Sequence, residues 1–254
     1  MTQAFKFQRN FLVNTYDCDF ENRWKPTAFF KTMSEIASNH ADALGSGYKD
    51  LSKAGYFWVL SRFKVRFLKY PQLGDLIKIN TWPKTIQQKL FYVRDYELFD
   101  QSKEPVALAT SAWLVVNAES KRLVSPASLP GLKMPSNPEA FALDEPLEKL
   151  KMDENGEVKI RQKASYSAID LVGHVNNTRY IDLICDSVDF AHYQTQEFDS
   201  LQINFDKEVR HGEEVEVRET LLQEDPMILG FVGNNLTKKT RAFEAVIQMR
   251  SKSK

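Results

Sequence analysis

The sequence predicts an α+β fold in which two antiparallel sheets each wrap one long helix. First, an extended segment, a helical pattern and four strand-like runs occur in that order, and the same order then occurs again. Second, one run of alternating apolar residues, Phe63–Phe67, recurs 138 positions later as Leu201–Phe205. Third, a stretch with five prolines and no periodicity, residues 125–146, separates the two copies. These observations indicate a duplicated unit.

The first copy begins with an extended segment, Phe5 to Cys18, which is rich in aromatic and β-branched residues. A helix is predicted from Pro26 to Leu44, because proline suits a first helical turn and apolar residues recur at helical spacing. Gly45 and Gly47 end it. Short turns bound the four strands that follow: Tyr56 to Lys69, Asp75 to Lys84, Lys89 to Phe99 and Pro105 to Asn117.

The second copy repeats this order, with an extended segment from Val158 to Ala168 and a helix from Thr178 to His192. Its four predicted strands are Phe198 to Lys207, Glu214 to Leu222, Ile228 to Leu236 and Arg241 to Met249. We therefore predict an N-terminal domain over residues 1–130, a linker over 131–150 and a C-terminal domain over 151–254.

Composition narrows the classes of function. Lys plus Arg and Asp plus Glu both number 34, so no excess of positive charge favours nucleic-acid binding. No apolar run is long enough to span a bilayer and the strand pattern starts almost at Met1, so we expect a cytoplasmic protein. Cys18 and Cys185 lack metal-ligand spacing, and neither a zinc site nor a disulfide framework is expected.

The stretch from Asp170 to Tyr180 places a carboxylate, an imidazole and two amides just before the second helix. Asn176 or Asn177 is expected to cap that helix. Backbone N–H groups at a helix start are unpaired and stabilise negative charge, which suits a carbonyl oxygen that becomes an oxyanion. The alternative is purely structural, because such residues usually cap helices and a loop histidine is usually a surface residue.

The run D-x-x-G-H-V-N-N-x-x-Y resembles the signature of hot-dog-fold thioesterases, and the length and doubling resemble the acyl-ACP thioesterases in particular. The resemblance implies a tandem (double) hot-dog fold. It also implies hydrolysis of the thioester of fatty acyl-ACP in fatty acid biosynthesis, with acyl carrier protein (ACP) as partner and with no metal or organic cofactor.

Carried over residue by residue, the resemblance implies catalytic roles for Asp170, His174 and Glu208. Two positions depart from the family: Val172 stands where the family has Asn, and Val209 stands where it has Cys after the glutamate. A cysteine nucleophile is thereby excluded at that position. We expect Glu208, with His174, to activate water, and Asp170 to position His174 or the substrate. Backbone N–H groups at the start of the second helix are expected to hold the thioester oxygen, and the oxyanion and substrate-positioning residues are Val175, Asn176 and Asn177.

The first copy has Arg23 where the second has His174, and Tyr70 where it has Glu208. We therefore assign chemistry to the second copy and substrate shaping to the first. An acyl pocket is expected along the apolar face of the first helix and beside it, although such a face is more often core: Phe29, Phe30, Met33, Ile36 and Trp58. Cations on one strand face, Arg62, Lys64 and Arg66, are expected to meet the acidic carrier, with a solvated edge strand as the alternative.

Three other functions stay open: an acyl-CoA thioesterase of the same fold, a hot-dog hydratase or dehydratase, and a non-catalytic acyl-thioester sensor. Glu208 itself has a structural alternative, as an exposed strand-end carboxylate paired with Lys207 or Arg210. The sequence also leaves open the acyl chain length and whether two chains form a homodimer.

Overall fold

The computed structural model describes residues 6–129, 132 and 134–252. Contacts between Cα atoms group the chain into two compact units, Met1–Leu147 and Glu148–Lys254, which are described here one at a time. The predicted boundary between residues 130 and 131 lies outside the described residues.

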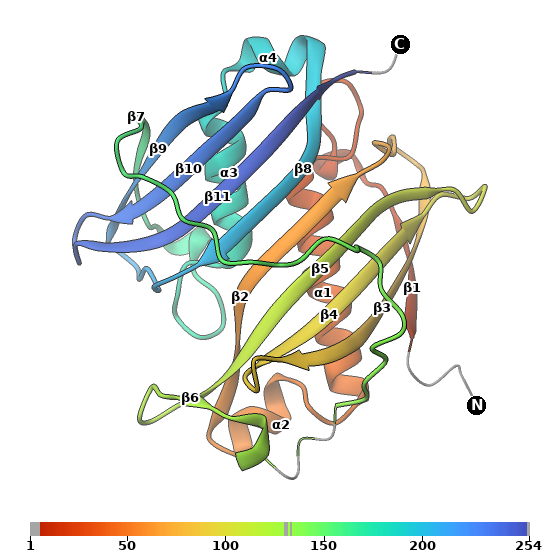
Figure 1. Ribbon diagram of the computed structural model, residues 1–254, viewed down its shortest axis with the longest axis vertical. Coiled ribbons are helices and arrows are strands. Elements are labelled where there is room, and N and C mark those ends of the chain that lie inside the picture. The colour runs from red at the N-terminus through yellow and green to blue at the C-terminus, as the bar shows by residue number, and fades with distance from the viewer. Residues whose placement is uncertain (1–5, 130–131, 133, 253–254) are drawn as a thin grey trace. The chain divides into compact units, whose positions relative to one another are not determined.

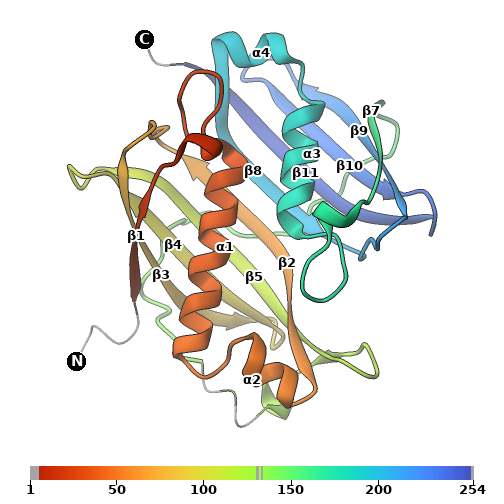
Figure 2. The same ribbon diagram turned by 180° about the vertical axis from the view of Figure 1, so that it is seen from behind.

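In the first unit, an antiparallel sheet with the strand order β1-β3-β4-β5-β2 packs one face against helix α1 (Figures 1 and 2). The short strand β6 pairs with β5. The elements are β1 (Phe7–Leu12), a 3₁₀ turn (Thr15–Asp17), α1 (Pro26–Ala43), α2 (Tyr48–Lys53), β2 (Tyr56–Phe67), β3 (Leu76–Gln87), β4 (Phe91–Phe99), β5 (Pro105–Asn117), β6 (Leu123–Val124) and a second 3₁₀ turn (Pro126–Ser128).

Helix α1 forms as its sequence pattern predicts. Pro26 occupies the first turn, where its missing N–H costs no hydrogen bond. The apolar face of the helix is buried against the sheet. There the ring of Phe30 packs edge to face on that of Phe63, with 4.6 Å between the ring centroids. The helix ends before Gly45, whose φ of +68° is a left-handed conformation that suits glycine.

The opposite face of this sheet is crossed by the chain between residues 134 and 147. Nε1 of Trp82 donates to the carbonyl of Ala140 at 3.1 Å, and the N–H of Ala142 donates to the carboxylate of Asp95 at 2.8 Å. Asp95 is fully buried and also pairs with Lys84 at 3.2 Å. The proline-rich segment is thus fixed to the first unit by specific polar contacts.

The second unit repeats the same order of elements, as the sequence predicts: β7 (Glu157–Lys163), a 3₁₀ turn (Tyr166–Ala168), α3 (Asn177–Ser187), α4 (Phe190–Thr195), β8 (Gln196–Phe205), β9 (Glu214–Gln223), β10 (Ile228–Asn235) and β11 (Thr240–Ser251). Its antiparallel sheet has the order β8-β11-β10-β9-β7, and α3 packs on one face (Figure 2).

One helix differs from expectation. The predicted helix from Thr178 to His192 is in fact two helices, because Val188 has an extended backbone with ψ of 132°. The side chain of Asp189 then caps α4 by accepting from the N–H of Ala191 at 2.8 Å. The long single helix was therefore wrong for this copy.

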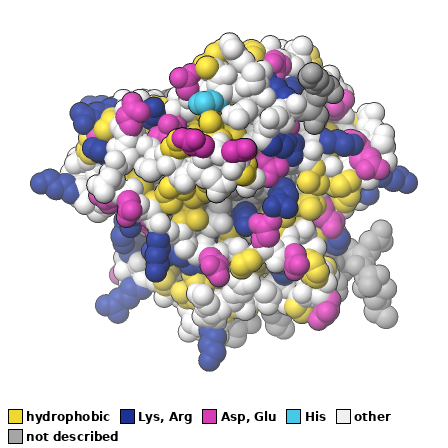
Figure 3. Space-filling model, turned by 45° about the horizontal axis from the view of Figure 1, so that its top comes forward, with side chains coloured by type: hydrophobic (Ala, Val, Ile, Leu, Met, Phe, Trp, Pro, Cys, Tyr) yellow, Lys and Arg dark blue, Asp and Glu magenta, His cyan; other side chains and the backbone are white. Residues whose placement is uncertain are grey.

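Charged side chains of both signs are interspersed over the face drawn in Figure 3, in keeping with the balanced composition. Among the described residues, no helix combines the length and the apolar character needed to cross a membrane.

Candidate active site

The loop before α3 is organised by Asp170. Its Oδ1 accepts from the backbone N–H groups of Val172 at 3.0 Å and His174 at 3.2 Å. The backbone N–H of Asp170 donates to the carbonyl of His174 at 2.8 Å, and Gly173 takes the left-handed φ of +80° that this tight turn requires. Asp170 therefore contacts His174 through its backbone.

The first unit contains the same loop, built around Asp19. Oδ1 of Asp19 accepts from the N–H groups of Glu21 and Arg23, both at 2.9 Å, and Asn22 takes the left-handed φ of 62°. The side chain of Arg23 also hydrogen-bonds Oδ2 of Asp19, at 3.2 and 3.3 Å. Within the part of the chain that the structure describes, Oδ2 of Asp170 accepts no such bond, so this oxygen distinguishes the second copy.

His174 and Glu208 come together in the second unit. Nε2 of His174 lies 3.7 Å from Oε1 of Glu208, and the same oxygen accepts from Nη2 of Arg210 at 3.0 Å. The carboxylate of Glu208 is about half exposed (51%), whereas the imidazole is 21% exposed. Glu208 thus has both partners that the sequence allowed for, a histidine and a neighbouring arginine.

Backbone pairing holds this arrangement. His174 forms a β-bridge with Arg210, and the N–H of Val175 donates to the carbonyl of Val209 at 2.8 Å. In the first unit, Arg23 forms the equivalent bridge with Gln72, and the guanidinium of Arg23 lies 5.5 Å from the centre of the Tyr70 ring. The two copies therefore place the same two positions in contact, but only the second places an imidazole against a carboxylate.

The three residues predicted to hold the oxyanion differ in whether their backbone N–H groups already have an acceptor in the protein. The N–H of Val175 is used by Val209, and the N–H of Asn176 donates to the carbonyl of Ala168 at 2.8 Å, so the expected N–H role is wrong for these two residues. Oδ1 of Asn176 caps α3 by accepting from Thr178 N–H at 2.9 Å, as predicted. Within the described chain, the N–H of Asn177, the first residue of α3, has no protein partner.

The two positions that depart from the family motif differ in their exposure to solvent. Val209 is completely buried, and the side chain of Val172 is 41% exposed on the loop. Tyr180, the last residue of the motif, is buried against Phe243, and burial raises the pKa of its hydroxyl, with the nearby carboxylates adding to the effect. Tyr180 is therefore a neutral hydroxyl.

The predicted acyl-pocket residues of α1 all lie at the interface between helix and sheet. Phe29, Phe30, Met33 and Ile36 are each at most 3% exposed. Trp58, on β2, is partly buried and belongs to a separate apolar cluster around Tyr92 and Val115. The structure thus brings the four helix residues together and places Trp58 in a different group.

The predicted carrier-binding row is not a free basic surface. Arg62, Lys64 and Arg66 do share the outer face of β2, but Arg62 donates to the carbonyl of Leu147 at 3.0 Å. Lys64 and Arg66 both pair with Glu145, the latter at 2.6 Å. These partners lie about 80 residues later in the chain, where a strand pattern gives no sign of them, and the carrier-binding role of the row stays a prediction.

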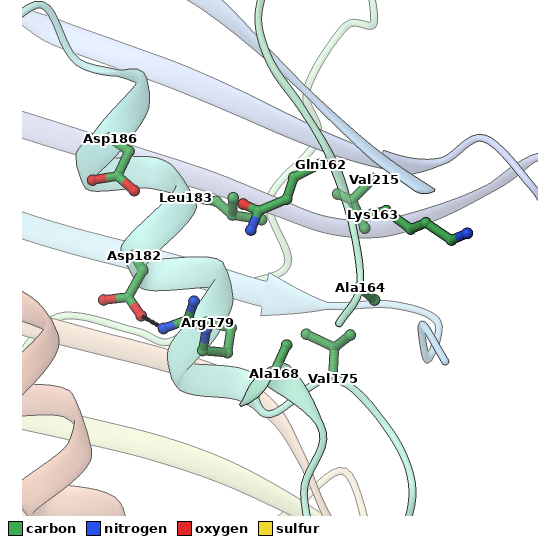
Figure 4. Close-up of a pocket in the computed structure, with 10 residues that line it drawn as sticks. All are labelled: Gln162, Lys163, Ala164, Ala168, Val175, Arg179, Asp182, Leu183, Asp186 and Val215. Atoms are coloured by element: carbon green, nitrogen blue, oxygen red, sulfur yellow. Dashed lines mark hydrogen bonds and ion pairs between the residues drawn. The ribbon is translucent and has the colours of Figure 1, made fainter. Parts of the chain in front are cut away.

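A pocket opens between α3 and β7 in the second unit (Figure 4). It is lined by Gln162, Lys163, Ala164, Ala168, Val175, Arg179, Asp182, Leu183, Asp186 and Val215. In the wall formed by α3, Nη1 of Arg179 forms a salt bridge with Oδ2 of Asp182 at 2.7 Å. The described residues include no group of three or more His, Cys, Asp or Glu side chains arranged to hold a metal ion.

Comparison with known proteins shows the family and the fold of the chain. Residues 4–127 match the acyl-ACP thioesterase N-terminal domain and residues 150–248 match the acyl-ACP thioesterase C-terminal domain. A palmitoyl-acyl carrier protein thioesterase of Arabidopsis thaliana is 25% identical over 217 residues, covering 80% of this chain and 52% of the relative. The chain thus spans about half the length of that relative.

Two solved structures share the fold. The acyl-ACP thioesterase of Bacteroides thetaiotaomicron has a TM-score of 0.80 at 21% identity, covering 96% of this chain and 98% of its own. The 12:0-ACP thioesterase of Umbellularia californica has a TM-score of 0.85 at 20% identity, covering 97% and 94%. The fold is the double hot-dog that the sequence predicts. The two domain matches, which together span most of the sequence, show that the chain belongs to the acyl-ACP thioesterase family.

Proposed function

We propose that this protein hydrolyses the thioester of fatty acyl-ACP, releasing a free fatty acid and the carrier thiol. The observation that supports the proposal most directly is the 3.7 Å approach of Nε2 of His174 to Oε1 of Glu208, which has an Arg23–Tyr70 pair at the equivalent place in the first unit. Family membership supports ACP as carrier and the fatty acyl group as substrate.

Glu208 and His174 are close enough to act on the same water molecule, because a water bound to Oε1 of Glu208 also lies near Nε2 of His174, 3.7 Å from that oxygen. In the proposed reaction, Glu208 accepts a proton as this water attacks the carbonyl carbon. The C–S bond then breaks, and the proton passes to the departing sulfur so that the carrier leaves as a thiol. Half-exposed Glu208 is accessible to water and substrate.

The N–H of Asn177 is the backbone donor that we assign to the thioester oxygen. It is the first N–H of an 11-residue helix, so the positive end of the helix dipole adds to the stabilisation of the developing negative charge. Asp170 has two roles in this proposal: its Oδ1 fixes the loop that presents His174, and its Oδ2, which has no protein hydrogen bond within the described chain, is assigned to the substrate. Removing one oxyanion donor typically costs about 10²-fold or more in kcat.

The first unit is proposed to shape the substrate site. The buried face of α1, from Phe29 to Ile36, is the apolar surface that we assign to the acyl chain. A cytoplasmic location and a homodimer remain predictions from the sequence.

The test is release of free thiol from acyl-ACP and from acyl-CoA over several chain lengths. Faster turnover of acyl-ACP supports the proposal. Preference for acyl-CoA would instead make the protein an acyl-CoA thioesterase, and binding without thiol release would make it a sensor. Formation or loss of a double bond in the acyl chain without thiol release would indicate a hydratase or dehydratase.

A further inference from the structure

Arg94 is a buried cation in the first unit. It lies on β4, is 5% exposed, and points toward α1, where its Nη1 donates to Nδ1 of His40 at 2.9 Å. The same Nη1 donates to Oγ1 of Thr81 at 3.2 Å. Because arginine is only a donor, Nδ1 of His40 must be the acceptor, which places the imidazole proton on Nε2.

Neither partner supplies negative charge. Among the described residues, no carboxylate oxygen lies within 4.0 Å of the guanidinium of Arg94. The next residue, Asp95, faces the other side of the sheet and pairs with Lys84. Burial, and then the nearby Arg94, lower the pKa of His40 to about 4, so the imidazole is neutral at physiological pH. A buried charge without a counter-charge lowers the stability of the folded state.

The second unit shows that the fold does not need a cation here. Phe63 and Arg94 flank Ser111 in the first sheet, just as Leu201 and Leu229 flank Ile247 in the second. Because Phe63 and Leu201 are equivalent in the repeat, the strand register makes Leu229 the counterpart of Arg94. Leu229 is an ordinary buried side chain, 5% exposed.

Arg94 contacts the face of α1 that we assign to the acyl chain, because its partner His40 lies on that face. His40 continues the buried stripe of α1 that includes Met33 and Ile36, which are the residues that we assign to the acyl pocket. The ring of Phe7 stacks on the imidazole of His40 at 5.0 Å and closes this end of the stripe. This end of the buried face of α1 thus carries a guanidinium, an imidazole and a hydroxyl.

We propose that Arg94, supported by His40 and Thr81, binds an oxygen atom of the acyl chain, and that the substrates are oxygenated acyl thioesters. This inference rests on the function proposed above. Nη1 uses its hydrogens on His40 and Thr81, whereas the guanidinium also carries N–H groups on Nε and Nη2, for which the described chain offers no acceptor. A hydroxyl, oxo or carboxylate oxygen would accept from them, and an alkyl chain would leave them unpaired.

The experiment compares acyl-ACP substrates of equal chain length that are unsubstituted, hydroxylated, oxo-substituted or ω-carboxylated. We expect at least one oxygenated chain to exceed the unsubstituted chain in kcat/KM by about tenfold or more, the range for a hydrogen bond to a charged group. In Arg94→Leu, which installs the side chain found in the second unit, the ratio should fall to about one. Arg122→Leu, at an exposed position, should keep the wild-type ratio.

A binding measurement separates this inference from the proposed function. Non-hydrolysable S-alkyl-CoA thioethers, with and without an ω-hydroxyl or ω-carboxylate group, are titrated into wild type and Arg94→Leu by calorimetry. Tighter binding of an oxygenated thioether that is lost in Arg94→Leu supports the subsite even if no thioester is hydrolysed. If Arg94→Leu does not fold, Arg94→Lys, which keeps the charge but lacks the planar fork, should lower the preference. Equal binding and turnover of oxygenated and plain chains by the wild type would overturn the inference.

Discussion

Oε1 of Glu208 lies 3.7 Å from Nε2 of His174, at the place where the first unit sets the Arg23 guanidinium over the Tyr70 ring. The surrounding backbone is the same in both units: a β-bridge joins Arg23 to Gln72 and His174 to Arg210. Duplication therefore preserved the frame while the side chains diverged. A carboxylate beside an imidazole can exchange a proton with water, whereas an arginine beside a tyrosine cannot do so near neutral pH.

Glu208→Gln should lower kcat by roughly 10²–10⁴ and leave the fold intact, because the amide keeps the size of the side chain but cannot accept the proton. Thiol release under saturating acyl-ACP measures the loss, and circular dichroism checks the fold. His174→Ala should cause a similar loss, and the double variant should lose little more, since both groups act on one step.

Glu224→Gln is the matched control for Glu208→Gln, because Glu224 is exposed on the turn after β9. It should retain wild-type kcat. Near wild-type turnover by a folded Glu208→Gln protein would mean that another group supplies the base.

Asp170 and its repeat partner Asp19 allow loop stability to be separated from chemistry. Each holds its loop with two N–H bonds to Oδ1, so Asp19→Ala and Asp170→Ala should each lose about 1–2 kcal/mol of unfolding free energy. Urea titration measures this. Asp170→Asn keeps an acceptor oxygen and should stay close to wild-type stability.

The two aspartates should differ in the effect of substitution on kcat. Asp170→Asn should lower kcat by roughly 10²–10⁴, as expected for a member of the catalytic group, whereas Asp19→Asn should leave kcat unchanged. Equal activities for these two variants would place Asp170 in a purely structural role.

Glu145 should stabilise the first unit by its pairing with Lys64 and Arg66. The hydrogen bond from Lys64 is the main cause that lowers the pKa of Glu145 below its ordinary value of 4.5, although partial burial opposes it. A carboxyl with a lowered pKa stabilises the fold above its unfolded pKa and loses that contribution as the pH falls below about 4.5. Glu145→Gln should therefore unfold more easily at pH 7, by about 1 kcal/mol or less, because the pair is partly exposed.

Chemical unfolding at pH 7 and in 0.1 and 1 M salt tests this, since salt should narrow the difference between Glu145→Gln and wild type. Glu139→Gln, another exposed glutamate of the same segment, is the control. A KM for acyl-ACP that rose in Lys64→Ala without any loss of stability would restore the carrier-binding role of this row.

Local patterns determined what could be predicted from the sequence. The helical stripe of α1, the strand alternation around Phe63 and the Asn176 cap all depend on neighbouring residues, and each lies where it was expected. The repeated element order followed from the register of the two copies. The double hot-dog fold could thus be predicted from short-range patterns, from their recurrence 138 positions later, and from the resemblance of the motif between Asp170 and Tyr180.

Partners distant in sequence could not be predicted in this way. Glu145 reaches Lys64, and His40 reaches Arg94, only once the chain has folded. The amides of Val175 and Asn176 looked available because their acceptors, Val209 and Ala168, come from loop pairings that no periodic pattern reveals. The break at Val188 likewise depends on Asp189 capping a new helix, although an apolar spacing continues through it.

Because of His40, the free energy of unfolding should decrease in mildly acidic solution. Burial, followed by the charge of Arg94, lowers the pKa of its imidazole to about 4, against 6.5 in the unfolded chain. Between these values the unfolded state binds a proton that the folded state does not, so the free energy of unfolding decreases as the pH falls from 6.5 to 4. At about 1.36 kcal/mol per pKa unit, the decrease has a ceiling of about 3 kcal/mol.

His40→Gln isolates this contribution, because glutamine can accept the hydrogen bond from Arg94 but does not titrate. Urea unfolding of both proteins at half-unit pH steps gives the difference in unfolding free energy, from which the carboxylates that titrate in both proteins cancel. This difference should change by up to about 3 kcal/mol in favour of His40→Gln between pH 6.5 and pH 4. His211→Gln, at an exposed position, should show no such trend. A pH-independent difference for His40→Gln would mean that folding does not lower the pKa of this imidazole.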